Sequence, residues 1–407
     1  MVAGGMAVGA RITGKHSGER FDLVKRFAQD YLGRSLAGGN GADCYPIAVA
    51  GFSFYDQVRP MWWQFPVAEV YVPRWLLQST ATGTSLRVNV LVQASSEVEQ
   101  VCAEVENCWA SLASWMSLDF CWQGRANRIA YQEVEGDRHW SEMVTQAKIM
   151  IEQGKLTKIV LARSLEVSAV EPIKPLHLLD RLRTSYPECV CFGINLGGAA
   201  SFIGATPEFL LQFDLRAGVL NLRSDALAGS SRRGLTLAQD QALGQELLRS
   251  PKNGLEHQIV VNSIRDRLLE IGANLDPTVP PQLLQLKNVQ HLHTVIKGQL
   301  LPKEPFQSLE ILARLHPTAA MGGEPRQAAL AIMQDWEASD RGWYAAPIGW
   351  FGGEQEQGAF VVGIRSGYIQ GNRARIFAGA GIVAESDLAT ELEETTLKFA
   401  ALLEAIA

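Results

Sequence analysis

The sequence contains few cysteines, no long apolar segment and no excess of positive charge. Six cysteines in 407 residues are too sparse for a disulfide scaffold, so we expect reduced, buried thiols in a cytoplasmic protein. The sequence contains no run of 18 apolar residues, so it predicts no transmembrane helix. The segment Met1–Arg20 lacks the continuous apolar core of a signal peptide, and we expect it to form a loose tail.

The charge balance argues against one large class of partners. Lysine and arginine number 37 against 43 aspartates and glutamates, a formal net charge of -6, whereas nucleic-acid binders usually present a basic face. An anionic small substrate stays possible, because a few buried cations decide its binding locally. With 47% hydrophobic and 20% charged residues, the composition is that of an ordinary globular protein and excludes a disordered chain or a fibrous rod.

Local patterns divide the chain near residue 140 into 1–139 and 140–407. The first part shows strand-like pieces and one helix, expected at Ile47–Tyr55, Glu69–Val72, Leu86–Gln93 and Glu97–Met116. In the second part we expect a helix from Trp140 that ends near Gly154, a strand over Thr157–Val167, and helices over 250–271 and 389–406. Helix 250–271 should turn Leu255, Ile259 and Leu268 inward. Strands without regular βα alternation predict an α+β fold with mostly antiparallel sheet.

The expected last helix carries Glu391, Glu394 and Lys398 on one face. This spacing is typical of a solvated ion pair, which stabilises a helix by about 0.3–0.5 kcal/mol. The segment Ala378–Gly381 just before it permits a second interpretation, because small residues let a ligand approach the backbone and their N–H groups can cradle an anion. A tight bend between strand and helix explains the same glycines.

Helix 250–271 carries a similar ambiguity. Lys252 and Glu256 are spaced as a solvated i,i+4 pair, but Glu256 could also be held beside Glu394 as a second oxygen ligand. Two carboxylates completed by substrate oxygens and water suit Mg2+ better than zinc. Sequence spacing alone does not bring the two glutamates together.

Two further ionisable residues sit in apolar strand patterns. Lys158 begins the run Lys158–Arg163 and is either a base in apolar surroundings or a lysine that extends to solvent from the strand end. Glu208 enters the apolar run Phe209–Phe213 and is either an edge-strand residue or a buried proton donor with a raised pKa. His291 and His293 lack a third ligand at metal spacing, so we interpret them as site-lining or core residues.

One segment combines small residues with cations. Ala228–Ser230 followed by Arg232 and Arg233 could form a phosphate-binding loop, but it lacks the spacing of a nucleotide-binding motif.

These segments together resemble the chorismate-utilising enzymes, and within them the isochorismate synthases. Eight motifs appear in family order within 140–407, at 158–163, 202–208, 227–230, 256–257, 289–292, 316–320, 340–344 and 377–383, and the run 394–398 closes the set. Residues 1–139 match only loosely, as is usual for the family's variable part. The resemblance implies one large α+β unit of antiparallel sheets packed as two lobes, with helices outside and the site between the lobes.

The resemblance also implies roles for particular residues. Lys158 matches the lysine that activates water for attack at C2 of chorismate, and Glu208 matches the acid that protonates the departing C4 hydroxyl. Glu256 and Glu394 match the Mg2+ ligands. Substrate contacts are matched by Ser230, His291, Tyr344, Arg365, Gly379, Gly381 and Lys398. No charged site residue departs from the family pattern.

The resemblance leaves alternatives open. A salicylate synthase makes isochorismate and then eliminates pyruvate with the same acid, base and metal. Anthranilate or aminodeoxychorismate synthases generally lack a lysine at the position of Lys158 and need a glutaminase partner, which we do not expect here. A non-catalytic anion-binding protein on the same fold would be expected to lose Lys158, Glu208 or a metal glutamate. We expect a monomer that serves menaquinone or phylloquinone biosynthesis; the sequence does not separate that route from a siderophore pathway.

Overall fold

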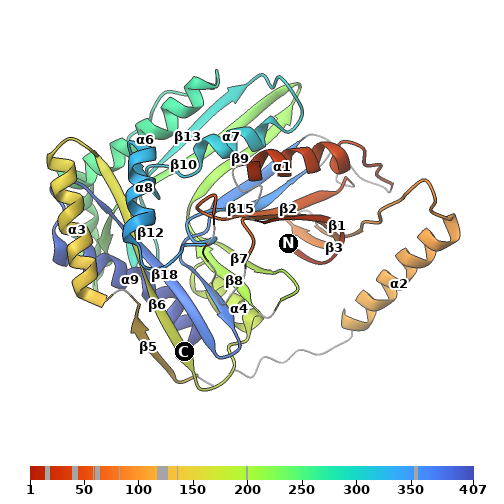
Figure 1. The fold of residues 1–407 in the computed structure, drawn as a ribbon, viewed down its shortest axis with the longest axis horizontal. Helices are drawn as coiled ribbons and strands as arrows, with labels where there is room; N and C mark the ends of the chain where they lie inside the picture. Colours follow the sequence, from red (N-terminus) through yellow and green to blue (C-terminus); the bar gives the residue numbers. More distant parts are fainter. Residues whose placement is uncertain are drawn as a thin grey trace.

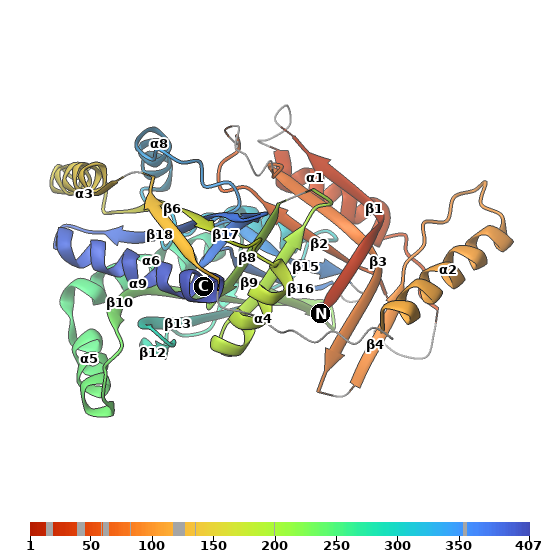
Figure 2. The same cartoon turned by 90° about the horizontal axis from the view of Figure 1, so that it is seen from below.

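The computed structural model describes residues 1–13, 19–38, 45–57, 59, 65–81, 83–116, 127–134, 136–198, 200–352 and 356–407. Cys44 and Cys121 lie outside these residues. Two antiparallel sheets form the centre of the molecule, and helices lie outside them (Figures 1 and 2). The α+β fold with mostly antiparallel sheet is therefore confirmed. No helix in the described part of the chain is long and apolar enough to cross a membrane.

The larger sheet has eleven strands drawn from both parts of the chain. Its strands are β1 (Val2–Ile12), β2 (Ile47–Phe52), β3 (Ala68–Thr80), β4 (Gly83–Val88), β9 (Phe209–Arg216), β10 (Val219–Arg232), β11 (Asn274–Leu275), β12 (Gln282–Gln285), β13 (Val289–Leu300), β15 (Pro347–Gly352) and β16 (Gln357–Val362). The main order is β1-β3-β2-β15-β16-β9-β10-β13-β11, with β4 on β3 and β12 on β13. Strand β2 pairs with β15 from Ile47↔Gly352 to Gly51↔Ile348, so residues on both sides of position 140 share this sheet.

The smaller sheet has seven strands, all from the second part of the chain except β5. They are β5 (Ile129–Glu133), β6 (Lys158–Ala169), β7 (Val190–Asn195), β8 (Ser201–Thr206), β14 (Gly323–Glu324), β17 (Ser366–Gln370) and β18 (Arg373–Ile382). Its order is β14-β6-β18-β17-β8-β7, with β5 added on β6. Strands β6 and β18 pair in one continuous register from Ile159↔Ile382 to Ser168↔Arg373, which makes them the rigid centre of this sheet.

Helices cover the outer faces. They are α1 (Arg20–Phe27), α2 (Val98–Met116), α3 (Gly136–Glu152), α4 (Pro175–Ser185), α5 (Leu237–Arg249), α6 (Pro251–Glu270), α7 (Gln307–Leu315), α8 (Arg326–Trp336) and α9 (Leu388–Ile406). Two caps fix where the site helices begin: Ser250 Oγ accepts the amide of Asn253, and Asp387 accepts the amide of Thr390. Figure 2 shows α9 beside β18 and α6 beside β10, so both helices border the space between the sheets.

Two apolar clusters hold these layers together. The larger one fills the space between the two sheets and includes Phe52, Phe202, Trp343 and Phe360, all almost fully buried. The smaller one lies between the seven-stranded sheet and helices α4 and α9. The site strands are thus packed on both faces, and their side chains have little freedom to shift.

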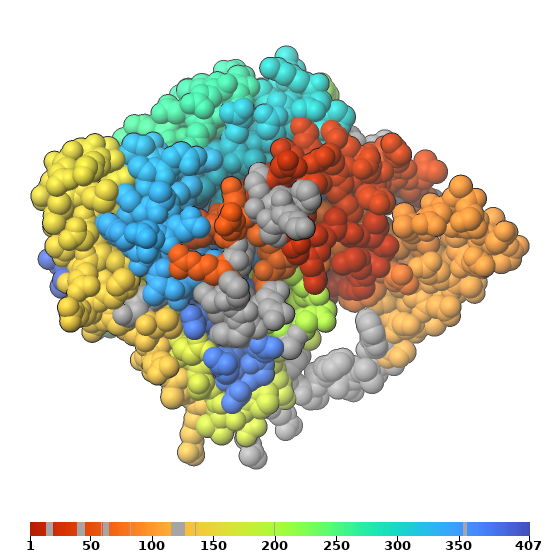
Figure 3. Space-filling view, in the orientation of Figure 1, coloured from red at the N-terminus to blue at the C-terminus, as the bar shows by residue number. Residues whose placement is uncertain are grey.

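The expectation of a loose tail over Met1–Arg20 was wrong. Residues Val2–Ile12 form β1, which pairs with β3 from Val2↔Leu77 to Ile12↔Ala68. Arg20 begins α1 and is only 5% exposed. The glycine-rich β1 sequence carries little local strand preference, and its long-range partner decides its conformation. Figure 3 shows the surface of this N-terminal part against that of α7, on which α1 packs.

Other local expectations were partly wrong. Leu255 was expected to face inward but is 48% exposed, while Val260, Val261, Ile264 and Leu268 form the buried face of α6. The strand expected at Leu86–Gln93 ends at Val88 as part of β4. Helices α4 and α5 were not predicted. The last helix was predicted within one residue at its start, and Gly154 has the positive φ of +70° expected after α3.

Candidate active site

A cavity between the two sheets gathers ten of the eleven residues singled out from the sequence. Its wall includes Glu208, Ser230, Glu256, His291, Tyr344, Arg365, Gly379, Gly381, Glu394 and Lys398. The eleventh, Lys158, contacts the cavity wall through Glu256. Apolar residues that the sequence analysis did not name as site residues add to the lining: Val160, Leu227, Ala320, Met321, Ile364 and Phe377. All but Met321 and Ile364 lie within the family motifs, which were the only sequence signal for them.

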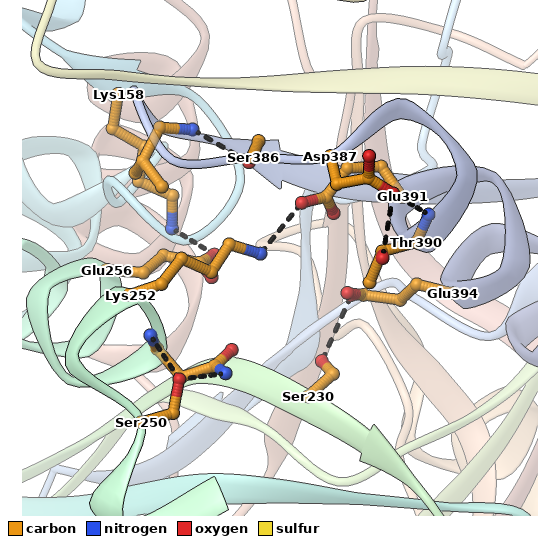
Figure 4. A network of polar contacts seen from close by, with 12 residues as sticks. Lys158, Ser230, Ser250, Lys252, Glu256, Ser386, Asp387, Thr390, Glu391 and Glu394 are labelled. Carbon is orange, nitrogen blue, oxygen red and sulfur yellow. Dashed lines mark hydrogen bonds and ion pairs between the residues drawn. The ribbon is translucent and has the colours of Figure 1, made fainter.

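Lys158 lies at the start of β6 and is buried, with 1% of its surface exposed. Its Nζ atom is 3.1 Å from Oε1 of Glu256, which projects from the first turns of α6 (Figure 4). The expected i,i+4 pair between Lys252 and Glu256 is not what the structure shows. Lys252 instead reaches Oε1 of Glu391 on α9 at 2.7 Å, so each carboxylate has its own cation. Burying charges without such pairing would be strongly unfavourable.

Glycine residues on β18 make room for these side chains. A Cβ atom built on Gly381 would lie 2.2 Å from Oε1 of Glu256 and 2.8 Å from Cε of Lys158. On Gly379 it would lie 3.2 Å from the hydroxyl of Tyr344. Neither glycine lies in a bend before the last helix, as one interpretation of Ala378–Gly381 had it. Both sit inside the regular β6–β18 ladder, where the absence of a side chain leaves space in the cavity.

A chain of hydrogen bonds crosses the cavity from Arg365 to Lys398. Nη2 of Arg365 donates to Nε2 of His291 at 2.9 Å, and Nδ1 of His291 is 2.9 Å from Oγ of Ser230. Ser230 donates to Oε1 of Glu394 at 3.0 Å, and Nζ of Lys398 donates to the same oxygen at 2.5 Å. Lys398 also donates to the carbonyl of Gly379 at 2.7 Å, which ties α9 to β18.

The direction of this chain fixes the state of His291. An arginine can only donate, so Nε2 of His291 accepts and Nδ1 carries the hydrogen that points to Ser230. Burial, together with the nearby cations Arg365 and Lys398, lowers the pKa of His291 well below its usual value. The ring is therefore neutral and links Arg365 to Ser230. Its place in the cavity wall is the one expected for a site-lining residue.

Glu208 is set apart from this network. It is 1% exposed, and within the part of the chain that the structure describes neither of its carboxyl oxygens has a hydrogen-bond partner. Burial is the largest cause that raises its pKa, to about 8, and nearby Asp225 adds to the rise while Lys158 and Lys398 oppose it. The raised pKa expected for a buried proton donor is thus confirmed. At neutral pH the carboxyl group is mostly protonated and can donate.

The carboxylates on α6 and α9 fit a hard cation. Glu256 and Glu394 both face the cavity, and Glu391 is buried beside them with its pKa raised by burial and by Glu394. Burial alone would raise the pKa of Glu394 too, but Lys398 lowers it, so this carboxylate is ionised. Among the described residues no group of three or more histidine, cysteine or acidic side chains is arranged as a complete metal site. Magnesium typically takes one or two protein carboxylates and completes its shell with substrate and water, which is the donor set present here.

The segment around Ser230 is not a phosphate loop. Ala228–Ser230 lie within β10, where a bulge between Ala228 and Ser230 and a φ of +77° at Gly229 turn Ser230 toward the cavity. Arg233 is held by both carboxylate oxygens of Asp240, so it faces away from the site network.

Comparison with known proteins gives a consistent set of relatives. The family described as "Chorismate binding enzyme" matches residues 2–407. Isochorismate synthase MenF of Bacillus subtilis is 37% identical over 89% of this chain and 74% of its own length. The salicylate biosynthesis isochorismate synthase of Pseudomonas aeruginosa is 40% identical over 66% of this chain and 55% of its own length. The solved structure of the menaquinone-specific isochorismate synthase MenF from Escherichia coli superposes with a TM-score of 0.79, covering 98% of this chain and 84% of that one at 27% identity.

Proposed function

The chain belongs to the family of chorismate-binding enzymes, and we propose that it is an isochorismate synthase, an isomerase that moves a hydroxyl group on the ring of chorismate from C4 to C2. The observation that carries this proposal is the cavity between the sheets, where the buried Lys158–Glu256 pair, the buried Glu208 and Glu394 come together. The names of its relatives support the same reaction.

In the proposed reaction Lys158 acts as the base and Glu208 as the acid. Lys158 takes a proton from a water molecule that attacks C2, and Glu208 gives its proton to the C4 hydroxyl, which leaves as water. Both ring double bonds shift by one position away from C2 and toward C4, so one water enters, one leaves and the net reaction is an isomerisation. Lys158 lies on β6, and Glu208 lies in the turn before β9. These separate positions allow base and acid to face different parts of one ring.

The other cavity residues are suited to a dianion. Chorismate carries two carboxylates, and burying them requires paired cations or donors. Arg365 presents a planar guanidinium that can bind a carboxylate through two hydrogen bonds, and Lys398 adds a point charge. Burial raises the pKa of Tyr344 to about 12, so its hydroxyl stays protonated and can donate. The open space at Gly379 and Gly381 lets the substrate approach the β18 backbone.

Magnesium is the proposed cofactor, held by Glu256 and Glu394. The bound ion would supply positive charge that polarises and orients the ring carboxylate of the substrate. Adding a dication and a dianion together leaves the net charge of the cavity unchanged, which makes joint binding electrostatically reasonable. Lysine contacts hold both carboxylates at the cavity wall, Lys158 on Glu256 and Lys398 on Glu394, and Lys398 lowers the pKa of Glu394.

The test is to incubate the purified protein with chorismate, with and without Mg2+, and to separate the products by chromatography. We expect an isochorismate peak that depends on Mg2+. Lys158→Met and Glu208→Gln should each lose at least about a hundredfold in kcat, the usual contribution of a positioned acid or base. Matched controls are Lys155→Met and Glu188→Gln, which change exposed residues of the same kinds and should keep native turnover.

Other products would change the conclusion. Salicylate with pyruvate would move the protein to the salicylate synthases while keeping the same acid and base. Unchanged chorismate in every condition, including added ammonia, would favour a non-catalytic anion-binding protein. Native turnover in Lys158→Met or Glu208→Gln would refute the assigned roles.

For the pathway we propose quinone biosynthesis, menaquinone or phylloquinone. The support is the similarity to MenF over most of the chain. The Pseudomonas relative, whose name refers to salicylate biosynthesis, keeps the siderophore route as the second candidate. Expression in a bacterium that lacks its menaquinone-specific isochorismate synthase should restore menaquinone. Failure there, with restoration in a siderophore-deficient strain, would favour the second route.

A further inference from the structure

We propose that Asp225 is a positioning residue whose fixed negative charge keeps the proton on Glu208, so that this acid is protonated before each turnover. This inference rests on the proposed function, in which Glu208 is the proton donor. Asp225 lies on β10, next to the turn that carries Glu208 into β9, and neither the sequence patterns nor the family resemblance singled it out.

The two carboxyl groups are neighbours in a place that water does not reach. Asp225 is 2% exposed and Glu208 is 1% exposed. Oδ2 of Asp225 accepts the amide of Phe209, the residue directly after Glu208, at 3.2 Å. Ser224 Oγ donates to the carbonyl of Leu210 at 2.8 Å, so this end of β10 is fastened to the beginning of β9. The negative charge of Asp225 therefore adds to burial in disfavouring the ionised form of Glu208.

Their partners decide which one carries the charge. Asp225 has a guanidinium beside it, because Nε and Nη2 of Arg223 donate to its Oδ1 at 3.3 and 3.2 Å. Nε2 of His293 on β13 also lies 3.3 Å from that oxygen. Glu208 has no hydrogen-bond partner for either oxygen among the described residues. The contacts with Arg223 therefore favour the negative charge on Asp225, while burial favours the protonated form of Glu208.

The remaining charged groups around Glu208 act against Asp225. Lys158 on β6 and Lys398 on α9 both lower the pKa of Glu208, and burial and Asp225 raise it. Without an anion on β10, the two lysines would draw the proton away from Glu208. Asp225 thus offsets the effect of the two lysines on Glu208, namely Lys158, the proposed base, and Lys398, a proposed contact for the anionic substrate.

The test is the pH dependence of kcat/KM in four proteins. Glu208 must be protonated to donate, so activity falls as pH rises through its pKa. Asp225→Asn keeps an oxygen for the Phe209 amide but removes the charge, and should move this basic limb down by about one pH unit. Arg223→Gln removes the guanidinium that favours the charge on Asp225, and should move the limb down by less than Asp225→Asn does. Asp214→Asn, a charge loss at the partly exposed far end of β9, should leave the limb in place.

A second readout does not depend on turnover. The infrared band of the protonated Glu208 carboxyl, identified as the band that Glu208→Gln lacks, should disappear at lower pH in Asp225→Asn than in the native protein. An unchanged band and an unchanged basic limb in Asp225→Asn would overturn the proposal. So would an equal loss of activity at every pH with a native band, which indicates a structural role alone.

These outcomes separate the inference from the proposed function. If the native protein makes no isochorismate, the proposed function fails, but the infrared titration still shows whether Asp225 holds the proton on Glu208. If Asp225→Asn does not fold, the downward shift in Arg223→Gln carries the test, since the Arg223 side chain is 39% exposed and its removal opens no buried cavity. An unchanged limb in that case would overturn the proposal.

Discussion

Replacing Gly381 by alanine should disable the site while leaving the fold in place. The added Cβ would lie 2.2 Å from Oε1 of Glu256 and 2.8 Å from Cε of Lys158, whereas ordinary contacts begin at 3.4 Å. Glu256 must therefore withdraw by about 1 Å, and its 3.1 Å contact with Lys158 is lost or distorted. Gly381 has no positive φ, so the substitution adds no backbone strain, and the conflict is confined to these two side chains.

The size of the effect follows from the displacement. A misplacement of about 1 Å in a catalytic arrangement can cost a hundredfold in rate, so we expect kcat/KM of Gly381→Ala to fall by about two orders of magnitude. The Mg2+ concentration at half-maximal activity should rise as well, because Glu256 is a proposed ligand. The free energy of unfolding should change by about 1–3 kcal/mol at most, the usual cost of overpacking.

Gly379→Ala is the matched control on the same strand. Its Cβ would meet Leu161 O at 3.1 Å and the Tyr344 hydroxyl at 3.2 Å, contacts that a shift of a few tenths of an ångström relieves. We expect a loss in kcat/KM of about tenfold or less, since the displacement is small. The assay is initial-rate chromatography of isochorismate over a Mg2+ series, with urea unfolding of each variant. Native kcat/KM in Gly381→Ala, or a larger loss in Gly379→Ala, would refute this reasoning.

Two further predictions concern stability. Arg341→Met should lower the free energy of unfolding by about 3–5 kcal/mol in urea titrations, because it leaves the buried Glu337 carboxylate without its cation; a loss below 1 kcal/mol would contradict this. Burial lowers the pKa of His316 well below its usual value. Below about pH 6.5 the unfolded chain therefore binds a proton at this histidine and the folded protein does not, so the free energy of unfolding decreases as pH falls. Between pH 7 and pH 5 the native protein should therefore lose about 2 kcal/mol more than His316→Asn, and equal losses in the two proteins would contradict this.

The local elements that the sequence predicted well are those whose residues suffice to define them. Helix α6 begins after its N-cap Ser250, with Pro251 in its first turn. Helix α9 begins after its N-cap Asp387. Strand β6 is rich in Ile, Val and Leu because nearly all of its positions are buried. In these segments the local conformational preference of the residues agrees with their burial in the fold. The apolar periodicity and the capping residues therefore suffice to predict these helices and this strand.

The remaining parts depend on contacts that one sequence does not display. Strand β1 exists because β3 offers it a partner far away in the sequence, as the pairing of Val2 with Leu77 shows. The ion pairs of the site cross between elements, so the spacing of Lys252 and Glu256 suggested the wrong partners for both. The importance of Asp225 comes from its position beside Glu208, which only the fold creates. The site residues themselves were named through the family resemblance, and their convergence on one cavity agrees with it.

The division of the site between the two sheets has a consequence for how the molecule opens. Lys158 and Gly381 belong to one sheet, while Ser230 and His291 belong to the other, so a ligand that contacts all four fastens the sheets together. A ligand at a hundred times its Kd stabilises the closed form by about 2.7 kcal/mol. Amide hydrogen exchange should then slow in β6, β18, β10 and β13 in concert, whereas α2, which lies at the periphery in Figure 1, should exchange as before. The bound substrate would then link the two sheets and stabilise the fold for as long as it occupies the site, in addition to being the reactant.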